Sequence, residues 1–181
     1  MGKNWKFFKE SVRHFWQVGT LTRSSPFLVS SLLADIDFKT AKCIVEFGSG
    51  SGSVTREILR RMRPDATLYT YELSSVFYEE ISSIPDSRLH AVHGNATTAC
   101  DMFESQSVDC VISGLPMGNF RKNTKLRILS TVRTILKPQG HYSQFQYSLL
   151  DYRLMRRNFH KVRLGCAPLN FPPAFVYNCV N

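Results

Sequence analysis

The stretch Glu46-Phe47-Gly48-Ser49-Gly50-Ser51-Gly52 decides the fold of this chain. It follows the apolar run Cys43-Ile44-Val45 and precedes a helical pattern of apolar residues at positions 54, 58 and 62. An apolar strand that breaks into alternating glycines and then opens a helix is typical of a site for a nucleotide-like ligand. The glycines let backbone N–H groups approach closely, and the helix presents its free amides. A tight strand–helix turn without a ligand is the structural alternative.

Two acidic residues indicate which ligand this loop would bind. A second predicted strand, residues 67–72, ends in Glu72, and an acidic residue at this distance from the glycines can bind the hydroxyls of a ribose. Glu46 stands at the mouth of the first loop, where a carboxylate would repel a pyrophosphate but attract a ligand ammonium group. The two together favour S-adenosylmethionine, whose amino-acid end carries an amine, over a dinucleotide.

Strand-like and helical patterns alternate along the rest of the chain. The predicted strands span 42–47, 67–72, 89–93, 108–113, 142–147, 161–166 and 174–180, and the predicted helices 53–63, 74–84, 124–136 and 151–158. This alternation predicts a parallel sheet with helices on both faces, because right-handed crossovers need a helix between parallel strands. The last two strands have no helix between them and are expected to pair antiparallel. We therefore predict an α/β, Rossmann-like fold with a seven-stranded, mostly parallel sheet.

The N-terminal segment predicts an amphipathic basic helix over residues 3–17. Its apolar arc and its basic face include Trp5, Phe8, Val12, Phe15, Trp16, Lys6, Lys9 and Arg13. Such a helix suits the headgroup boundary of an anionic bilayer, and packing on the domain core is the alternative. Residues 18–26 predict a flexible lid or a linker, followed by a helix over 27–33. Residues 1–40 thus form an N-terminal helix and lid segment, and residues 41–181 form a single core domain.

Composition narrows the classes of partner. The chain has 181 residues, and 23 Lys and Arg against 14 Asp and Glu give a net charge of +9. This excess favours a polyanionic partner, either nucleic acid or an anionic membrane surface, although it also serves solubility. Five cysteines without a Cys-x-x-Cys pair indicate neither a disulfide framework nor a metal site, and Cys43, Cys110 and Cys179 are predicted to be core residues. No apolar stretch approaches the ~18 residues of a membrane span, so we expect a cytoplasmic protein.

These motifs resemble the class I S-adenosylmethionine-dependent methyltransferases over residues 42–181. The resemblance rests on Glu-x-Gly-x-Gly-x-Gly, then Glu72, then Gly94-Asn95-Ala96. It implies that the glycines approach the methionine and ribose portions of the cofactor and that Asn95 contacts the adenine edge. The family more often has aspartate there, and asparagine still offers an acceptor. The expected cofactor-binding residues are Glu46, Gly48, Gly50, Gly52, Glu72, Asn95 and Ala96.

A narrower resemblance concerns the methyl acceptor. Ser113-Gly114-Leu115-Pro116, after the fourth strand, is similar to the bacterial phosphatidylethanolamine N-methyltransferases. The similarity extends to Phe7-Phe8-Lys9-Glu10, Gln17-Val18-Gly19, Ser24-Ser25-Pro26 and Asn170-Phe171-Pro172-Pro173-Ala174. It implies a monomeric enzyme on the inner face of the cell membrane that methylates the amine of phosphatidylethanolamine, its methylated derivatives or ornithine lipid.

Residues near this loop have expected roles in methyl transfer. The carbonyls of Gly114 and Leu115 are candidates to accept amine hydrogens, and Pro116 would fix the loop. Tyr147 is expected to hydrogen-bond the acceptor amine or to face the ammonium group that forms on methylation. The alternative is a tyrosine at the end of the sheet whose hydroxyl is hydrogen-bonded to the backbone. The basic side chains that follow are expected to hold a lipid phosphate or to form a solvated helix start: Arg121, Lys122 and Lys125.

Two other functions are compatible with parts of the sequence. The ribosomal RNA adenine dimethyltransferases carry Asn-Leu/Ile-Pro-Tyr/Phe in the corresponding loop, where the ring stacks on the flipped adenine. Here Ser113 replaces the asparagine and Met117 the ring. Those enzymes also carry a C-terminal helical domain for RNA, whereas this sequence stops at its seventh predicted strand, so a nucleic-acid partner is not expected. A non-catalytic binding module is the second alternative, and calorimetry with S-adenosylmethionine would distinguish it.

Overall fold

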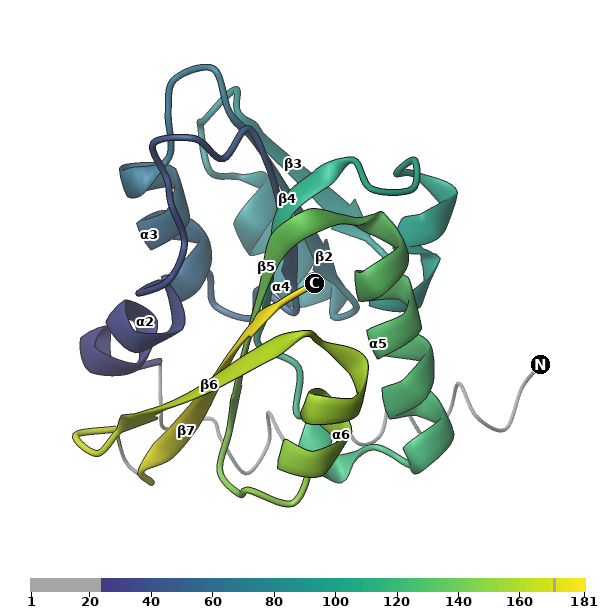
Figure 1. Cartoon of the computed structure of the whole chain (residues 1–181). Helices are drawn as coiled ribbons and strands as arrows, with labels where there is room; N and C mark the ends of the chain where they lie inside the picture. The colour runs from purple at the N-terminus through teal and green to yellow at the C-terminus, as the bar shows by residue number, and fades with distance from the viewer. Residues whose placement is uncertain (1–23, 171) are drawn as a thin grey trace.

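The structure, a computed structural model, describes residues 24–170 and 172–181 (Figure 1). Its elements are α2 (Pro26–Leu32), β1 (Cys43–Phe47), α3 (Ser53–Arg61), β2 (Thr67–Glu72), α4 (Ser75–Ser82), β3 (Leu89–His93), η1 (Ala96–Asp101), β4 (Val108–Ser113), η2 (Met117–Asn119), α5 (Lys122–Ile135), β5 (Leu136–Gln146), α6 (Tyr152–Asn158), β6 (Lys161–Ala167) and β7 (Ala174–Val180). The helix predicted over residues 3–17 lies outside the described residues, as do most of the lid residues.

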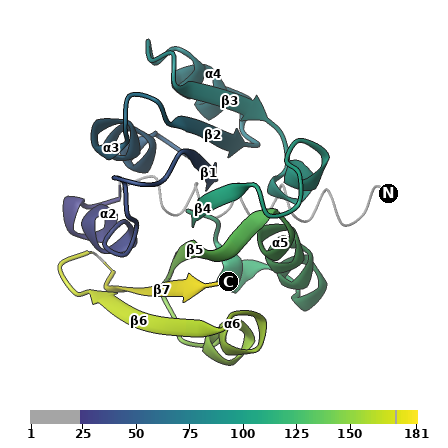
Figure 2. The same ribbon diagram turned by 45° about the horizontal axis from the view of Figure 1, so that its top comes forward.

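The seven strands form one sheet in the order β3-β2-β1-β4-β5-β7-β6. Strands β1 to β5 pair in parallel, whereas β7 is antiparallel to both of its neighbours, β5 and β6. The predicted Rossmann-like fold, with its mostly parallel sheet and antiparallel last strand, is therefore confirmed. The order reverses between β1 and β4 (Figure 2). In open sheets of this kind, ligands bind beyond the carboxyl ends of the strands at this switch point.

Helices cover both faces of the sheet, because successive strand residues point to opposite sides. On β1, Ile44 packs in the core beneath α2 and α3, whereas Val45 packs in the core beneath α5 and α6. Figure 2 shows the two helical layers on either side of the strands. Cys110 and Cys179 are buried in these cores as predicted, and Cys43 is only partly buried.

The predicted bounds of strands β2, β3, β4 and β7 are confirmed, but the fifth strand is longer than the sequence predicts. Helix α5 ends at Ile135, and β5 begins at once at Leu136 rather than at Tyr142. Pro138 therefore does not stop a helix; it lies in the strand, followed by Gln139 with a φ of 62°. The register between β4 and β5 shifts at this point, so the proline occupies an irregularity that does not need its missing N–H.

Two further local features differ from the sequence prediction. Ser25 does not lie in a loose linker: its hydroxyl accepts a hydrogen bond from the Leu28 N–H, and Pro26 begins α2. Short 3₁₀ helices over 96–101 and 117–119 were not predicted. Two residues separate β3 from the first of them and three separate β4 from the second, so both lie in the loops that form the site.

Candidate active site

Four loops meet at the carboxyl edge of the sheet through backbone hydrogen bonds. The Gly48 N–H donates to Tyr71 O at 2.8 Å, and the Gly94 N–H donates to Glu72 O at 3.0 Å. The Gly114 N–H donates to Phe47 O at 2.8 Å. The loops after β1, β2, β3 and β4 are thus joined, and they carry the residues predicted to bind cofactor and acceptor.

The glycine loop has a backbone that favours glycine at three positions. Gly48, Gly50 and Gly52 have φ angles of 77°, 51° and 78°, which side-chain-bearing residues rarely adopt. A Cβ at Gly48 would lie 3.0 Å from a methyl carbon of Leu115, so the glycine also lets the two loops pack together. Gly52 is the N-cap of α3, whose first N–H groups are available at the loop.

Glu72 is held by three backbone N–H groups. Its Oε1 accepts from Leu73 N and Ser74 N, both at 2.8 Å, and its Oε2 accepts from Gly50 N at 2.9 Å. The side chain is buried against the glycine loop. A carboxylate has about four lone-pair positions, so Oε2 retains one for a ligand hydroxyl.

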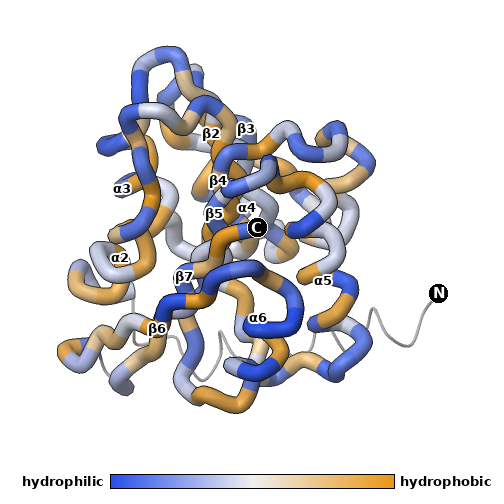
Figure 3. Tube along the Cα trace, viewed as in Figure 1, coloured by the Kyte–Doolittle hydropathy of each residue, from blue (hydrophilic) through white to orange (hydrophobic). Residues whose placement is uncertain are grey.

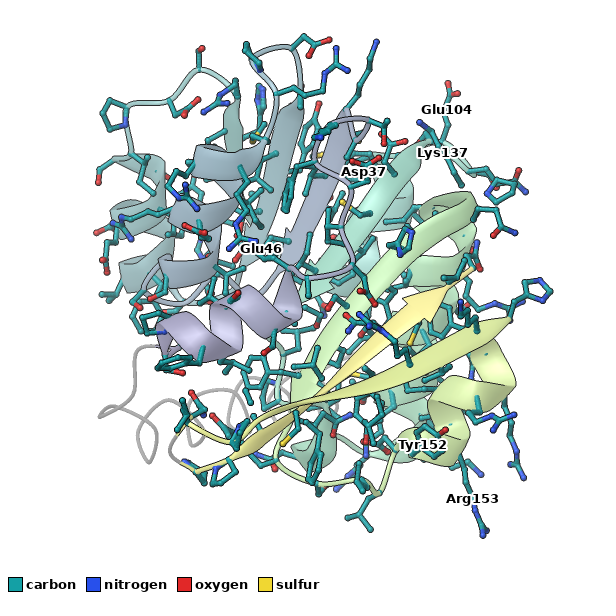
Figure 4. All side chains as sticks on the ribbon, turned by 60° about the vertical axis from the view of Figure 1, so that its left-hand side comes forward. Asp37, Glu46, Glu104, Lys137, Tyr152 and Arg153 are labelled. Carbon is teal, nitrogen blue, oxygen red and sulfur yellow. The ribbon has the colours of Figure 1, made fainter. Side chains whose placement is uncertain are left out.

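The sequence suggested that Glu46 lies open at the mouth of the glycine loop, but the structure buries it. Its side chain is only 1% exposed and lies between α3 and the sheet (Figure 4). Oε2 accepts hydrogen bonds from Thr55 Oγ1 at 2.7 Å and Thr70 Oγ1 at 3.0 Å. Burial raises its pKa to about 7, against the lowering effect of the two threonine hydroxyls and with a small contribution from Glu72. Its contact with a ligand ammonium group stays a prediction.

Asn95 begins the short helix η1. Its Oδ1 accepts from Thr97 N at 2.9 Å and so caps η1, while Ala96 is buried as the first residue of that helix. An amide oxygen has two lone pairs, so Oδ1 can still accept from an adenine amine after capping. The predicted adenine contact is compatible with this arrangement.

The loop 113–116 is fixed by hydrogen bonds within the protein. The buried Ser113 hydroxyl accepts from Leu115 N at 3.3 Å. The Leu115 carbonyl accepts from both Met117 N at 2.8 Å and Gln144 Nε2 at 2.9 Å. Both lone pairs of this carbonyl are therefore used, which contradicts its expected role as an acceptor for amine hydrogens. The Gly114 carbonyl remains the candidate acceptor for the amine hydrogens. The buried Pro116 restricts the backbone of the turn.

Tyr147 follows the end of β5 and is partly exposed. Its ring packs edge-on against Phe145, with centroids 5.8 Å apart, and burial raises the pKa of its hydroxyl despite a hydrogen bond with Asn170. Asn170 Oδ1 in turn accepts from Ser25 N at 3.4 Å. Two of the segments that carry the narrower resemblance, 24–26 and 170–174, therefore meet beside Tyr147.

Comparison with known proteins assigns the fold and the reaction class. Residues 44–140 match the family model described as methyltransferase domain, which covers more than half of the chain. The chain belongs to this methyltransferase family. The predicted activity class, an S-adenosylmethionine-dependent methyltransferase, is confirmed by this match.

Among curated proteins, the methyltransferase is similar to the ornithine lipid N-methyltransferase of Singulisphaera acidiphila. The two are 29% identical over 180 residues, which cover 96% of this chain and 92% of the relative. Among solved structures, it resembles the 1,6-didemethyltoxoflavin-N1-methyltransferase of Burkholderia thailandensis, with a TM-score of 0.72, 11% identity, and coverage of 97% of this chain and 86% of that one.

It also resembles the spermidine synthase of Thermotoga maritima, with a TM-score of 0.64 and 16% identity. That alignment covers 86% of this chain but only 59% of the synthase. At these identities the two structural likenesses establish the fold alone.

The three basic side chains predicted to bind a lipid phosphate differ in their exposure and in their ion pairs. Arg121 and Lys122 lie exposed at the start of α5. Lys125 is instead partly buried, and its Nζ pairs with Asp151 Oδ1 at 2.7 Å and Oδ2 at 2.8 Å. A lysine engaged in this way is not available for a lipid phosphate. The remaining predicted membrane residues lie outside the described part of the chain: Trp5, Lys6, Phe8, Lys9 and Arg13.

Sequence reasoning missed two glutamines on β5. Gln144 holds the loop 113–116 through Leu115, and Gln146 lies two residues further along the same strand face. Their spacing of two residues, on either side of Phe145, was a signal that both side chains share one face of the strand. Within the described residues, no group of three or more His, Cys, Asp or Glu side chains is placed to hold a metal ion.

Proposed function

We propose that this methyltransferase transfers a methyl group from S-adenosylmethionine to the amine of a membrane-lipid headgroup. The acceptor is phosphatidylethanolamine, one of its methylated derivatives, or ornithine lipid. The observation that carries the proposal is the hydrogen bond from Gly114 N to Phe47 O. It joins the loop 113–116 to the strand end from which the glycine loop begins. An amine held by residues 113–116 would therefore lie next to a ligand on the glycine loop.

The residues present fit the methyl donor. The Ser49 hydroxyl is buried in the glycine loop and has no hydrogen-bond partner among the described residues, as expected of a group that awaits a ligand. Gly48, Gly50 and Gly52 would contact the methionine and ribose portions, Glu72 the ribose hydroxyls, and Asn95 the adenine. When bound, S-adenosylmethionine supplies a methyl carbon on a positively charged sulfur, and the electrons of the broken C–S bond stay on that sulfur.

The protein must then present a neutral amine, because a protonated amine has no lone pair with which to form the new N–C bond. The Gly114 carbonyl is proposed to accept one amine hydrogen and so to orient the lone pair. Ser113 and Pro116 hold the turn that carries this carbonyl. Tyr147 lies at the same edge, where its ring would face the alkylated ammonium product.

A lipid acceptor is supported by the surface at this edge as well as by the relative from Singulisphaera. The exposed apolar side chains include Leu149, Leu150 and Leu169, with Leu150 85% and Leu169 67% exposed. The register pairs Gln146 with Phe175, which places the loop after β5 and the loop before β7 at one edge of the sheet. Apolar side chains exposed together in this way indicate an interaction surface.

Basic side chains adjoin these leucines. Helix α6, which follows directly, exposes Arg153, Arg156 and Arg157. Figure 3 shows hydrophobic colour on the loop that joins β5 to α6 beside the hydrophilic colour of the helix, and in Figure 4 Arg153 points away from the protein. Leucines that enter the headgroup region next to arginines that meet lipid phosphates suit an anionic bilayer.

We therefore propose peripheral attachment to the inner face of the cell membrane. The helix predicted over residues 3–17 is a further candidate for membrane contact. Among the described residues, no helix is long and apolar enough to cross a membrane.

The test is methylation of defined vesicles by the full chain. Phosphatidylglycerol vesicles that contain either phosphatidylethanolamine or ornithine lipid are incubated with S-adenosylmethionine, and headgroup masses are measured. We expect mass increases in steps of one methylene group in at least one of the two lipids. Unchanged headgroup masses in both, together with methylation of added ribosomal RNA, would overturn the lipid proposal.

Membrane attachment is tested separately by sedimentation with the same vesicles. Leu150→Asp should reduce the bound fraction, and added salt should reduce it further, because both apolar burial and charge attraction contribute. The matched control is Leu164→Asp, which makes the same change at an exposed leucine on the edge strand β6. Equal binding of both variants and the unchanged protein would exclude this edge as the attachment surface.

A further inference from the structure

Gln144 and Gln146 lie on the same face of β5 and are both buried, yet only one of them is satisfied. Gln144 Oε1 accepts from Tyr142 Oη at 2.9 Å, and its Nε2 donates to Leu115 O at 2.9 Å and to Phe145 O. Gln146 is 4% exposed, and within the described part of the chain neither its Oε1 nor its Nε2 has a hydrogen-bond partner. A buried amide in this state destabilises the protein, so its presence needs an explanation such as a missing ligand.

The position of Gln146 indicates what that ligand touches. It is the last residue of β5, at the carboxyl edge of the sheet. A Cβ built on Gly118 would lie 3.5 Å from Gln146 Oε1, so the amide lies against the backbone of the segment that follows residues 113–116. Gly118 itself is exposed and carries no side chain to cover the amide. The unsatisfied group thus borders the loop to which the acceptor amine was assigned.

We propose that Gln146 binds the acceptor headgroup directly. Its Oε1 accepts a hydrogen from the amine, and its Nε2 donates to an oxygen of the same headgroup. This inference rests on the proposed function, and it names the group that selects the substrate. A zwitterionic aminolipid fits because it carries an N–H donor and an anionic or carbonyl oxygen on one small headgroup.

A neutral amide suits this position better than a carboxylate. A negative charge beside the amine would stabilise its protonated form and raise its pKa, which would remove the lone pair needed for methyl transfer. The amide oxygen orients an N–H without that effect and takes up no proton, so the proton released by the amine passes to water. A fully methylated ammonium has no N–H left to donate, so it loses this hydrogen bond and is released.

The experiment compares Gln146→Met, Gln146→Glu and a control, Gln139→Met. Gln139 lies exposed at the opposite end of the same strand, so the control makes the same chemical change away from the site. Activity is measured on phosphatidylglycerol vesicles that contain phosphatidylethanolamine or ornithine lipid. S-adenosylmethionine affinity is measured by calorimetry, and the thermal unfolding midpoint of each variant is recorded.

For Gln146→Met we expect kcat/KM for the aminolipid to fall by about tenfold or more, as for the loss of hydrogen bonds to a substrate. Cofactor affinity should stay within about twofold, and the unfolding midpoint should stay equal or rise, because an unsatisfied polar group is removed. Gln146→Glu should shift the pH profile of kcat/KM to higher pH, because its carboxylate favours the protonated amine. A purely structural glutamine would not produce that shift.

Two results would overturn the inference, and they are distinguishable. If the unchanged protein methylates an aminolipid and Gln146→Met does so with the same kcat/KM, Gln146 does not bind the acceptor, while the proposed function stands. If the unchanged protein binds S-adenosylmethionine but methylates neither lipid, the proposed function fails, and the assignment of this ligand to Gln146 fails with it.

Discussion

The Gly50 N–H donates a hydrogen bond of 2.9 Å to Glu72 Oε2 and so ties the glycine loop to the end of β2. The other carboxylate oxygen accepts from Leu73 N and Ser74 N. One side chain therefore both shapes the loop and offers a lone pair to a ligand hydroxyl. A cofactor that binds Glu72 would bind a group already held in place by three N–H donors, which reduces the ordering needed on binding.

Glu72→Gln should weaken S-adenosylmethionine binding. The NH₂ group of the new amide would face backbone N–H groups that now donate to the Glu72 carboxylate, either that of Gly50 or those of Leu73 and Ser74. Because an NH₂ group cannot accept, these hydrogen bonds would be lost. Such bonds contribute about 1.5–3 kcal/mol each, which predicts an increase in Kd of about tenfold or more by calorimetry. Glu104→Gln, on an exposed loop, is the control and should leave the Kd unchanged. An unchanged Kd in Glu72→Gln would contradict the assigned ribose contact.

Glu46 predicts a dependence of stability on pH. Its pKa is about 7 in the folded protein, against an ordinary value of 4.5, because it is buried. Between these pH values the folded state binds more protons than the unfolded state, so the free energy of unfolding falls as pH rises. Two and a half pKa units correspond to about 3 kcal/mol. Stability from this group is thus fully present below pH 4.5 and lost as pH rises through 7.

Glu46→Gln tests this dependence, because a neutral amide can accept from Thr55 and Thr70 without the cost of a buried charge. Urea unfolding should show a flatter pH dependence, with the variant gaining stability relative to the unchanged protein as pH increases to 8. Glu104→Gln again serves as the control, since it removes an exposed carboxylate. Parallel pH profiles for Glu46→Gln and the unchanged protein would show that the carboxylate is not desolvated.

Much of the fold followed from local patterns. Strand β1, the glycine loop and α3 are specified by neighbouring residues, and so are the ends of β2, β3, β4 and β7. The start of β5 was not, because Pro138 and Gly140 are typical of a helix end, and only pairing with β4 shows that a strand accommodates them. The local sequence favours a turn at residues 138–140, whereas pairing with β4 favours a strand, and the strand forms.

The sequence predicted which residues lie at the site better than it predicted the contacts that these residues make. The sequence indicated which loops meet, since parallel strands end at one edge. It did not indicate that Leu115 O is used by Gln144 or that Lys125 is used by Asp151, because both partners are distant in the chain. The burial of Glu46 also depends on Thr55 and Thr70, one from a helix and one from a neighbouring strand.

Gly114→Ala should disrupt the contact between the two loops. A Cβ at this position would lie 2.6 Å from the Gly48 carbonyl oxygen, a backbone atom that cannot move aside without distorting the glycine loop. We expect a loss of about 1–3 kcal/mol in stability, as for other overpacked sites, and weaker cofactor binding. Thermal unfolding and calorimetry measure these effects.

The control for that substitution is Gly165→Ala on β6, where the nearest heavy atom to a new Cβ is 3.7 Å away. It should change neither stability nor cofactor affinity by a comparable amount. If Gly114→Ala binds S-adenosylmethionine as tightly as the unchanged protein, the two loops are not coupled through this contact.

Lys125→Met should destabilise the protein and reposition the loop that follows Gln146. The side chains of Lys125 and Asp151 are 12% and 8% exposed, and their ion pair joins the first turn of α5 to the residue that precedes α6. Removal of one partner leaves a buried carboxylate without its counter-charge, which costs about 3–5 kcal/mol. Urea unfolding at pH 7 measures this loss.

The double variant Lys125→Met with Asp151→Asn separates the charge from the packing. With both charges removed, no uncompensated ion is buried, so the double variant should be more stable than Lys125→Met alone. Lys122→Met, which alters the exposed lysine at the first position of α5, should change stability by no more than about 0.5 kcal/mol. If Lys125→Met were as mild as Lys122→Met, the ion pair would not hold α6 in place. Other contacts would then position residues 147–151, among them the hydrogen bond of 3.0 Å that the Tyr177 hydroxyl donates to Ser148 O.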